Sequence, residues 1–498
     1  MLTKDFQVER SRAKKPLFYI APTPPNMHPM QFQLAGVEYA VARPHCLFGD
    51  APGLGKSAEC IMVSNAIEAK KTLVVCPASL RLNWEREIWA WSTQENVTTY
   101  PILKAKDGVD IGADYVIVSY ALLANKNIRE AIMDTTWDNL VLDEAHAMKD
   151  PNGNTRTRAI CGYYDGRDFN EGIENVCGRI TMASGTILPN QPIECYNAVR
   201  LMNWDAIDRM SLEDFREYYY RKGRGYVTGP YIAKFKNKLG EYEEVQRHGR
   251  HMSNNVRNIP IRLKDLQFRL RKHVMVRRLT EHVLPQLPQI RWKPVPLLQD
   301  AGIRKALSHP GWVEAEKLYQ MDEGAFSSGA PIDGSISTAR RELGEAKAPA
   351  IADYIHELIR SGTNKIIVSA WHHSVLDYLK QSLSEHGLVY MDGRTSATNK
   401  QKAVDMFQEH EGTKIILGQM ITLMMGWTLI AARDVVNAEP DWVSGNNEQL
   451  MFRVRRIGQK ADKLIGHMPL VPDTLDEHIL STVIKKDKNI YQALDAPI

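Results

Sequence analysis

Cysteine is scarce in this sequence and is poorly placed for a metal site or a disulfide framework. The 498 residues include 6 cysteines, which all precede residue 196. No two of them have the C-x-x-C spacing, and several fall inside apolar runs. This pattern argues against a zinc site and predicts buried, reduced thiols, as in a cytosolic protein.

Long apolar runs are also rare. The sequence begins Met1-Leu-Thr-Lys-Asp-Phe, which is charged and lacks the apolar core of a signal peptide. One charge-free run, residues 415–432, reaches the length considered for a membrane helix, but glycine, glutamine and threonine interrupt it. We expect a buried strand, a polar loop and a helix start there, and no membrane contact.

Neither sign of charge is in large excess. The chain has 63 Lys and Arg against 59 Asp and Glu, a net charge of +4. This mildly basic balance permits a polyanionic partner without requiring one. Hydrophobic residues at 44% and charged residues at 24% are ordinary for globular proteins, and the length predicts two or more domains, each with its own core.

A glycine-rich stretch from Asp50 to Ser57, Asp-Ala-Pro-Gly-Leu-Gly-Lys-Ser, lies between an apolar run and a helix-like run. Glycines at a strand-to-helix turn let backbone N–H groups surround an anion, and the helix N-terminus adds partial positive charge. Lys56 could then reach the outer phosphates of a nucleotide, and Ser57 could ligate magnesium. Asp50 stands where the strict Walker A pattern has glycine, and a ligand-free turn is the alternative.

An acidic pair supplies the second half of a nucleotide site. Asp143 and Glu144 follow the apolar run 139–142. We expect Asp143 to hold magnesium, directly or through water, and Glu144 to polarise the attacking water. An isolated pair is more often a solvated strand end, but this one follows the glycine-rich stretch at a typical distance. Together the two motifs predict ATP hydrolysis.

Two sets of strand-like apolar runs alternate with helical patterns, which predicts an α/β fold with parallel sheets buried on both faces. The first set comprises the run ending at Gly49 and residues 73–76, 115–118, 139–142 and 180–183. The second set comprises residues 365–369, 388–391, 414–417, 434–437 and 463–466. Polar residues follow the strands of the first set, and these should converge on one ligand crevice.

The second set has no phosphate loop, but it has two arginines with a suitable spacing. Arg453 and Arg456 are three residues apart, which predicts one helical face. Fixed guanidinium groups stabilise γ-phosphate charge, as arginine fingers do. The alternatives are a solvated helical face or direct contacts with DNA phosphates. As fingers, the two arginines imply a cleft that closes on ATP.

The regions between and around the two sets predict the domain organisation. Residues 205–285 are rich in aromatic and basic residues and predict a helical insertion, equally suited to nucleic-acid contacts and to a solvated face. Residues 322–337 predict a flexible loop. The expected units are an arm (1–28), a first ATP-binding lobe (29–204), a helical insertion (205–285), a helical linker (286–345) and a second lobe (346–498).

The motifs in this order resemble helicase superfamily two, and most of all its Swi/Snf-type duplex DNA translocases. The resemblance covers about residues 29–480 and is closest to small annealing-helicase-like and bacterial or phage members. Its diagnostic stretches are residues 33–37, 50–57, 75–80 with 83–84, 119–120, 143–146, 184–186, 277–279 followed by 284–288, 391–393, 441–442 and 453–459. An aspartate at position 50 is normal in that group.

The resemblance implies two RecA-like lobes with helical insertions, which bind double-stranded DNA and track along one strand by hydrolysing ATP with Mg²⁺. Gln33 would contact adenine, with Asp143 and Glu144 at the metal and water and Arg453 and Arg456 at the γ-phosphate. The phosphate loop would bind ATP through Asp50, Pro52, Gly53, Leu54, Gly55, Lys56 and Ser57. Segments that touch or support the DNA path contain Ser79, Ser119, Trp371, Thr428 and Trp442. The implied location is the cytoplasm of a bacterial or phage-infected cell, on DNA.

Some positions depart from the family pattern. Ala51-Pro52 replaces an acidic residue and methionine, residues 187–189 differ from the expected Pro-Leu, and residues 422–426 lack a glycine pair. Two other functions compete with duplex translocation. One is strand separation or the remodelling of branched or forked DNA, and the other is a non-catalytic DNA-binding scaffold. The intact Lys56, Asp143 and Glu144 argue against the scaffold.

Overall fold

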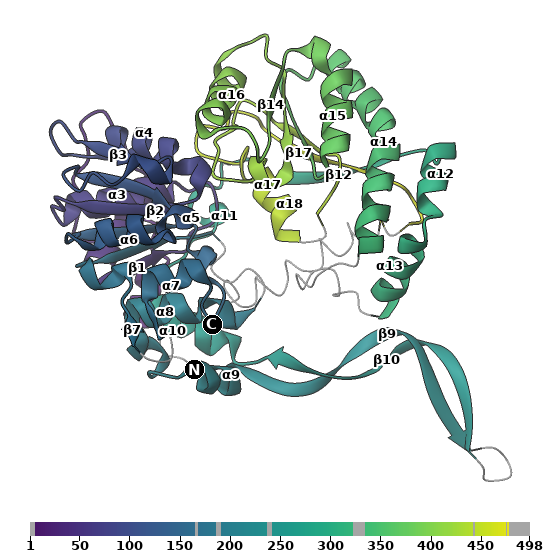
Figure 1. Ribbon diagram of the computed structural model, residues 1–498, viewed down its shortest axis with the longest axis horizontal. Coiled ribbons are helices and arrows are strands. Elements are labelled where there is room, and N and C mark those ends of the chain that lie inside the picture. The colour runs from purple at the N-terminus through teal and green to yellow at the C-terminus, as the bar shows by residue number, and fades with distance from the viewer. Residues whose placement is uncertain are drawn as a thin grey trace.

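Two parallel β-sheets with helices packed on them organise the chain (Figure 1). The structure is a computed structural model that describes residues 5–164, 168–185, 191–236, 242–321, 334–441, 444–474 and 476–477. We call the first sheet with its helices lobe 1 and the second sheet with its helices lobe 2.

The sheet of lobe 1 has seven strands, and every neighbouring pair is parallel. Its spatial order is β11 (Met275–Val276), β1 (His45–Phe48), β8 (Ile180–Ala183), β5 (Asn139–Asp143), β2 (Thr72–Cys76), β4 (Tyr115–Ser119) and β3 (Thr99–Pro101). Every residue of β2, β4 and β5 is buried. The predicted parallel sheet, covered on both faces, is confirmed.

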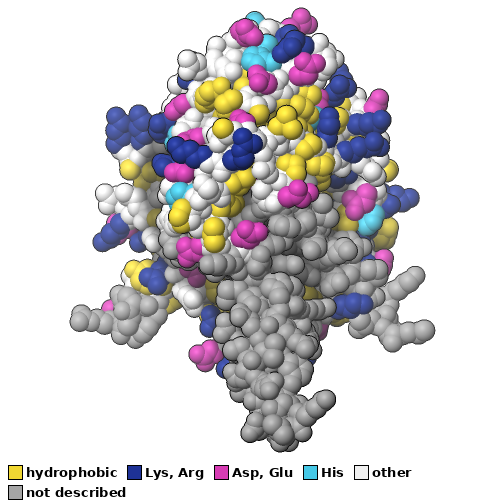
Figure 2. Space-filling view, turned by 90° about the vertical axis from the view of Figure 1, so that its right-hand side faces the viewer, with side chains coloured by type: hydrophobic (Ala, Val, Ile, Leu, Met, Phe, Trp, Pro, Cys, Tyr) yellow, Lys and Arg dark blue, Asp and Glu magenta, His cyan; other side chains and the backbone are white. Residues whose placement is uncertain are grey.

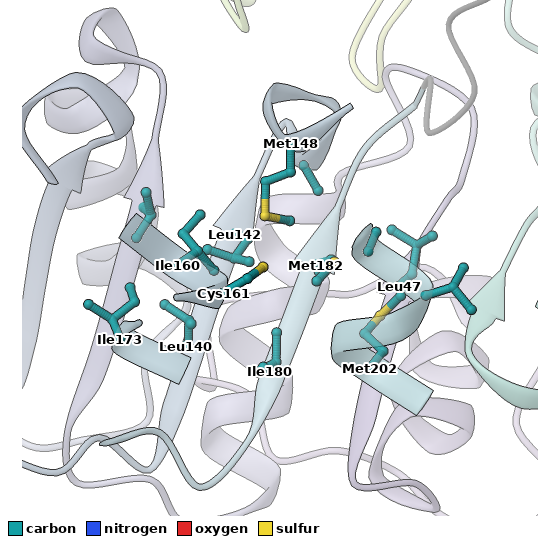
Figure 3. Packing of buried hydrophobic residues seen from close by; sticks show 14 of the residues in the cluster. Leu47, Leu140, Leu142, Met148, Ile160, Cys161, Ile173, Ile180, Met182 and Met202 are labelled. Carbon is teal, nitrogen blue, oxygen red and sulfur yellow. The ribbon is translucent and has the colours of Figure 1, made fainter. Parts of the chain in front are cut away.

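Each face of this sheet has its own core because successive side chains of a strand point to opposite faces. Leu47 packs in one cluster, whereas Cys46 and Phe48 pack in the other. Figure 3 shows the first cluster, in which strand residues such as Leu140 and Met182 meet helical residues such as Ile160. The main helices of lobe 1 are α2 (Gln31–Val41), α3 (Lys56–Ala66), α4 (Arg81–Trp91), α5 (Tyr120–Leu123), α6 (Lys126–Met133), α7 (Thr155–Cys161), α8 (Tyr196–Asn203), α9 (Leu212–Tyr219), α10 (Leu263–His273) and α11 (Thr280–Val283).

The sheet of lobe 2 has six strands, again all parallel. The order is β12 (Ile290–Pro296), β17 (Leu464–Leu470), β16 (Asp434–Asn437), β13 (Ile366–Ala370), β15 (Ile415–Gln419) and β14 (Leu388–Met391). Its helices are α12 (Ala301–Leu307), α13 (Pro310–Met321), α14 (Gly334–Arg360), α15 (His373–Ser382), α16 (Ala397–Glu409), α17 (Met420–Leu423) and α18 (Ser444–Met451). All five strand-like runs of the second set are confirmed.

Short elements complete the fold. They are the strand pair β6 (Tyr163–Tyr164) and β7 (Phe169–Asn170), and the 3₁₀ turns η1 (Ala78–Leu80), η2 (Ala105–Asp107), η3 (Ala145–Met148), η4 (Ile173–Val176), η5 (Pro192–Cys195), η6 (Trp204–Ile207) and η8 (Ser384–His386). The predicted irregular arm contains a helix, α1 (Phe6–Arg10), which contacts α10. Residues 17–19 of the arm are held against α2, because the carboxylate of Glu38 accepts hydrogen bonds from their backbone N–H groups.

The prediction of helices throughout residues 205–285 is wrong for residues 220–260. This segment forms an antiparallel ribbon of β9 (Tyr220–Lys236) and β10 (Tyr242–Pro260). Glycines at 223, 225 and 229 disfavour a helix, and the many aromatic and β-branched residues favour a strand. The basic residues had suggested a helical face, but basic residues suit either element.

The predicted boundaries between the lobes are also wrong in three places. The segment 205–285 contributes β11 to the sheet of lobe 1, and the linker 286–345 contributes β12 to the sheet of lobe 2. Helix α14 crosses the predicted boundary at residue 345. It begins at Gly334, which lies in the predicted flexible loop 322–337. Residues 322–333 of that loop lie outside the described residues. Both added strands lie at sheet edges, and β12 carries prolines that an edge tolerates.

Other predictions can be compared directly. The charge-free run 415–432 forms β15, α17 and a loop, and no helix among the described residues is long and apolar enough to cross a membrane. All six cysteines are free, and all except the half-buried Cys177 are buried, as predicted.

Helix α18 ends at Met451, so Arg453 and Arg456 lie in the turns that follow rather than on a helical face.

Candidate active site

A cavity of about 300 Å³ lies between the two lobes and brings together most of the predicted nucleotide site. Lobe 1 supplies the glycine-rich stretch, the acidic pair and Gln33, whereas lobe 2 supplies Arg453 and Arg456. The residues lining the cavity also include His28, Met30, Leu80, Asn83, Trp84, Glu87, Trp91, Gly185, Gly426, Thr428, Gln449 and Ile457. These segments are far apart in the sequence, so only the folded, closed arrangement forms this site.

The glycine-rich stretch forms the turn between β1 and α3. Gly53 and Gly55 have φ angles of 85° and 80°, a backbone region that favours glycine. A Cβ at Gly53 would collide with the carbonyl of Arg455 from lobe 2, and a Cβ at Gly55 would collide with the Gln33 amide. The stretch therefore needs glycine both for its own backbone and for the close approach of its neighbours.

Helix α3 begins at Lys56, so its N-terminus faces the cavity together with Pro52 and Ser57. The Lys56 ammonium donates hydrogen bonds to the carbonyls of Asp50 (2.9 Å) and Ala51 (3.3 Å). Burial lowers the pKa of Lys56, although the charges of Glu144, Asp50 and Asp143 oppose that effect. The turn thus places the Lys56 ammonium beside the N-terminus of α3, and both attract an anionic ligand.

Two residues of the stretch, Asp50 and Leu54, do not line the cavity, and their part in binding ATP stays a prediction. Leu54 is fully buried in a small apolar cluster. The Asp50 carboxylate accepts hydrogen bonds from the Arg278 guanidinium and from its backbone N–H (2.8 Å), and Arg278 also pairs with Glu59 of α3 (2.5 Å). All three side chains are buried, which raises the pKa of Glu59 because burial outweighs the charge of Arg278. Asp50 therefore ties the loop to α3 and to residue 278.

The Asp143 carboxylate is held by two hydrogen bonds at the end of β5. The Trp84 indole N–H donates to Oδ2 (2.8 Å), and the backbone N–H of Glu144 donates to Oδ1 (2.9 Å). Burial, followed by the charge of Glu144, raises the pKa of Asp143. A metal ion would reverse this effect because it stabilises the carboxylate.

Glu144 has a left-handed backbone, with φ at 50°, and its side chain is directed by His146. Its Oε2 lies 3.2 Å from His146 Nδ1, which also lies 3.3 Å from the Ser184 hydroxyl. Burial by itself raises the pKa of Glu144, but the hydrogen bond and charge of His146, together with Lys56 and Arg453, lower it overall. Glu144 is thus kept ionised beside the protonation-sensitive Asp143.

Gln33 is buried and bound to the phosphate loop. Its amide N–H₂ donates to the Leu54 carbonyl (3.1 Å), and its carbonyl accepts from the Met30 N–H (2.8 Å). Since Gln33 also lines the cavity, its amide joins the loop to the segment before α2.

The arginines of lobe 2 have few partners of their own. Arg453 is buried and donates from Nε to the Gln449 carbonyl (2.9 Å), whereas Arg456 donates to the Phe452 carbonyl (3.2 Å) and the Thr428 hydroxyl (3.1 Å). Within the described part of the chain, neither forms an ion pair with a carboxylate. Burial, followed by the charge of Arg456, lowers the pKa of Arg453 to about 9. The charges of Glu144 and Asp143 across the cavity oppose this lowering, and an anionic ligand would oppose it further.

The predicted DNA-contacting residues are scattered rather than gathered. Thr428 lines the nucleotide cavity, and the Ser119 hydroxyl is buried, where it caps α5 by accepting from the Leu122 N–H (3.2 Å). Trp371 is half-buried under the Arg340 guanidinium, 5.1 Å from the ring centre. Ser79 is buried. Trp442, like Thr186 and residues 187–189, lies outside the described residues.

The lobes also meet beside the cavity. The Ser79 hydroxyl lies 2.9 Å from the Met425 sulfur of lobe 2. On the other side of α4, the Arg86 guanidinium makes a two-point ion pair with Asp405 of α16, at 2.9 and 3.0 Å. These contacts join the same two walls that Gly53 and Arg455 bring together.

Sequence reasoning missed the residues that hold the site in place. Trp84 orients Asp143, and the triad of Asp50, Arg278 and Glu59 holds the loop. Trp84 and Arg278 occur in family motifs, which marks the positions, but no local pattern shows which partner each one binds. Glu59 could have been noticed as a charged residue inside an otherwise apolar helical run.

Comparisons with known proteins agree with these features. Residues 32–295 match the sequence model of the SNF2-related domain, and residues 347–458 match that of the helicase conserved C-terminal domain. A SWI/SNF-related matrix-associated actin-dependent regulator of chromatin subfamily A-like protein 1 from Xenopus tropicalis is 26% identical over 93% of this chain and 45% of its own length. The human DNA annealing helicase and endonuclease ZRANB3 is 26% identical over 90% of this chain and 38% of its own length. The chain thus spans less than half the length of these two relatives.

Among solved structures, the Sulfolobus solfataricus SWI2/SNF2 ATPase core in complex with dsDNA is 16% identical, covers 95% of this chain and 98% of its own, and has a TM-score of 0.39. The predicted resemblance and the predicted two-lobed α/β fold are confirmed. Because the first family model alone matches more than half of the sequence, the chain belongs to the SNF2-related family of helicase-like ATPases.

Proposed function

We propose that this protein is a DNA-stimulated ATPase that moves along double-stranded DNA and thereby remodels DNA or DNA-bound proteins. One observation carries the proposal: Lys56, Asp143 and Glu144 of lobe 1 line the same cavity as Arg453 and Arg456 of lobe 2. When a site is divided between two lobes, each hydrolysis event can change the relative orientation of the lobes. Movement along a polymer requires such a coupled change.

The residues at the glycine-rich turn fit a nucleoside triphosphate with Mg²⁺. The Ser57 hydroxyl and the Asp143 carboxylate are hard oxygen donors on one cavity wall, as magnesium prefers. When bound, Mg²⁺ would supply charge that neutralises the phosphates. Lys56 would exchange its two loop carbonyl contacts for phosphate oxygens.

Glu144 is best placed to activate water. Its pKa is lowered, whereas that of Asp143 is raised, and His146 fixes its orientation. It would accept a proton from the attacking water as that water reaches the γ-phosphate. Asp143, held by Trp84, would remain the metal ligand. The two neighbouring carboxylates would thus have different roles, water activation for Glu144 and metal binding for Asp143.

Arg453 and Arg456 would bind the γ-phosphate as its charge develops. Both lie on the cavity wall opposite the phosphate loop, and neither has a carboxylate partner among the described residues. An incoming triphosphate would add negative charge to that of Glu144 and Asp143 and would offer the two guanidinium groups direct partners, and so favour the closed lobes. Closure would then depend on the nucleotide state.

The DNA partner is a proposal that draws on relatives. Two are named a regulator of chromatin and a DNA annealing helicase, and one solved relative is described with dsDNA. Ser79 and Trp371 remain candidates to support a DNA path between the lobes. The word annealing in the relative's name favours a second candidate function, remodelling of branched or forked DNA or strand separation.

The deciding experiment measures ATP turnover with duplex, single-stranded and forked DNA, with Lys56→Ala as the inactive control. We expect strong stimulation by duplex, displacement of a triplex strand from intact duplex, and little separation of a plain duplex. Strand displacement from a fork without triplex displacement would favour the second candidate. Turnover that no DNA stimulates would exclude both and leave a scaffold with a residual ATPase site.

A further inference from the structure

The ribbon of β9 and β10 is the longest element outside the two lobes. Its strands pair with each other from Tyr220 and Pro260 to Lys236 and Tyr242, and with no other strand among the described residues. Seventeen residues of β9 extend for about 55 Å at the usual rise of a strand. Figure 1 shows the ribbon leaving α9, passing below both lobes and projecting past α13, which β9 contacts.

The net charge of this ribbon is more positive than that of the whole chain. Residues 220–260 contain nine Lys and Arg against three Asp and Glu, a net charge of +6, whereas the full chain carries +4. The rest of the chain is therefore slightly acidic, at −2. On the lobe 2 face in Figure 2, positive and negative side chains are interspersed over the described surface.

Strand register places much of this charge on one face of the ribbon. Alternate residues of a strand share a face, which groups the basic positions Lys222, Arg224, Lys234 and Lys236. Arg250 of β10 pairs with Thr228 and so joins that face, where Glu244 is the one acidic residue of the paired strands. Tyr226 and Tyr242 occupy positions on the same face. Basic residues with interleaved aromatics suit phosphate and base contacts.

Protection of exposed strand edges is the competing explanation, because lysines on an edge prevent pairing with other chains. That purpose requires only a few charges and does not require them to share one face. It also gives no reason for the rest of the chain to be acidic. A two-stranded ribbon has little stability of its own in water, so a long basic one is better explained if a polyanion lies along it.

We propose that the ribbon, residues 220–260, is a second nucleic-acid-binding element. It holds one duplex branch of branched DNA outside the cleft between the two lobes. This inference rests on the proposed function and narrows its substrate class to branched DNA. At about 3.4 Å per base pair, the ribbon is long enough to follow roughly 16 base pairs of duplex. Contacts with backbone phosphates make this binding independent of sequence.

The test replaces Lys222, Arg224, Lys234, Lys236 and Arg250 with glutamine. The matched control replaces five exposed basic residues of the lobes and the N-terminal arm with glutamine, namely Lys15, Lys70, Lys106, Arg291 and Lys305. We expect the ribbon variant to bind a fork at least about 10-fold more weakly than the control. Its slope of log K against log salt should be smaller by about 3 to 4 because fewer counterions are released. The plateau of duplex-stimulated ATP turnover should stay within twofold of the control.

Equal fork affinity in the ribbon variant and the control would overturn the proposal and would leave an acidic protein surface as the better partner. Absence of DNA binding and DNA stimulation in the unmodified protein is a different result, which would overturn the proposed function as well. If the five-residue variant unfolds in a thermal melt, Lys234→Gln with Lys236→Gln tests the same point with a smaller expected loss of about threefold.

A separate observation concerns a cluster of metal-binding side chains in lobe 2. His356 of α14 faces His386 of η8, with Nδ1 and Nε2 2.7 Å apart. The Glu385 carboxylate oxygen lies 3.6 Å from His356 Nδ1 and 3.5 Å from His386 Nε2. Ligand atoms of a tetrahedral zinc site are separated by about 3.3 Å, so the two distances to the carboxylate fit such a site, and the two imidazole nitrogens would move apart by about 0.6 Å on binding.

We infer that His356, Glu385 and His386 can bind a divalent transition metal of the zinc class, with water as the fourth ligand. The two imidazoles are half-buried and the carboxylate is exposed, so the open side faces solvent. The competing explanation is a simple hydrogen bond between the two histidines. Metal binding would fasten α14 to the turn before β14, away from the residues that line the nucleotide cavity.

Titration with Co²⁺ alone, followed by visible absorption, tests this site. We expect one saturable tetrahedral-type spectrum per chain, lost in His356→Gln and in His386→Gln and kept in His410→Gln. Zn²⁺ should displace Co²⁺ and raise the melting temperature of the unmodified protein. A spectrum that is absent, or that survives both variants, would overturn the inference.

Discussion

The two walls of the nucleotide cavity are held in different ways. On the lobe 1 wall, the charged groups are held by neighbours in the same lobe, as in Lys56 with Asp50, Asp143 with Trp84, and Glu144 with His146. On the lobe 2 wall, Arg453 and Arg456 have carbonyl and hydroxyl partners, and no carboxylate pairs with them in the described ranges. The lobe 1 wall is fixed by contacts within lobe 1, whereas the lobe 2 arginines interact with the charges of Glu144 and Asp143 across the cavity without a direct ion pair.

This difference suggests how the site works. Groups that are fixed before the ligand arrives can act without reorganising, which suits metal binding and water activation. Charged groups without a direct ion-pair partner can respond to the ligand, which suits a wall that must dock and release. Variants of the lobe 1 wall should therefore damage chemistry, and variants of the lobe 2 wall should damage the link between nucleotide and lobe closure.

The largest effect is expected for Glu144→Gln on the lobe 1 wall. The amide keeps the shape of the side chain but cannot accept a proton, so turnover should fall by about 10³- to 10⁴-fold while ATP stays bound. Single-turnover hydrolysis and binding of a fluorescent ATP analogue would measure the two quantities. Lys56→Ala is the contrasting variant, since it should lose nucleotide affinity. Substantial turnover by Glu144→Gln would contradict its role.

Arg456→Ala on the lobe 2 wall should have the next largest effect. The plateau of DNA-stimulated turnover should fall by about 10³-fold, the low end for an arginine finger, with the fold and the DNA affinity nearly unchanged. ATPase activity measured against DNA concentration distinguishes the roles. A depressed plateau supports the finger, whereas a shifted midpoint with an unchanged plateau would show that Arg456 binds DNA instead.

Trp84→Phe sharpens the comparison because it removes one hydrogen bond from the lobe 1 wall. Loss of the indole N–H would free Asp143 to reorient, and we expect about a 10-fold higher Mg²⁺ requirement for turnover. Trp137→Phe is a matched control, since Trp137 is also buried and donates to a backbone carbonyl, that of Ile132 (3.0 Å). An equal change in both variants would mean that the effect is only loss of packing.

The ion pair between Arg86 and Asp405 joins the two walls directly, but it is partly exposed. Exposed pairs contribute little, so Arg86→Glu should lower DNA-stimulated turnover by only about threefold at low salt. The exchange Arg86→Glu with Asp405→Arg should restore turnover, and high salt should remove the difference. If the exchange fails to restore turnover, the pair does not support closure.

The sequence predicted the lobe 1 wall more completely than the rest because its signals are local. Lys56, Ser57, Asp143 and Glu144 each lie at the end of a strand or at the start of a helix, where a short pattern gives both structure and role. Asp50 shows the limit of this reasoning. It stands within the motif, but its carboxylate binds Arg278, which is 228 residues away.

Predictions that depended on packing between distant segments were less successful. Ser119 is buried and caps a helix, and Thr428 lines the nucleotide cavity, which no short sequence pattern indicates; their place near the DNA path stays a prediction. The basic and aromatic residues of 220–260 fit a helix or a strand, and its glycines and β-branched residues are what favour the observed ribbon. Edge strands β11 and β12 are short or contain prolines, so their patterns are weak, and only pairing with a formed sheet defines them.

The smallest expected effect tests whether the stability of lobe 1 can be changed without affecting its wall. Glu174 lies in η4, near α6 and α7, and its Oε2 is buried with no hydrogen-bond partner among the described residues. Burial raises the pKa of Glu174 to about 7, although Arg200 opposes this effect. The folded protein therefore keeps this proton at a pH where the unfolded chain, with a pKa near 4.5, has released it.

Because the folded state binds more protons, the free energy of unfolding should fall as pH rises from about 4.5 through 7. Glu174→Gln cannot ionise, so it should match the unmodified protein at pH 4 and exceed its stability at pH 8 by about 1 kcal/mol. Urea unfolding of lobe 1 across this range measures the difference, with the exposed Glu171→Gln as the control. ATP turnover should be the same in all three proteins. A pH-independent difference would show that the carboxylate is already ionised in the folded state.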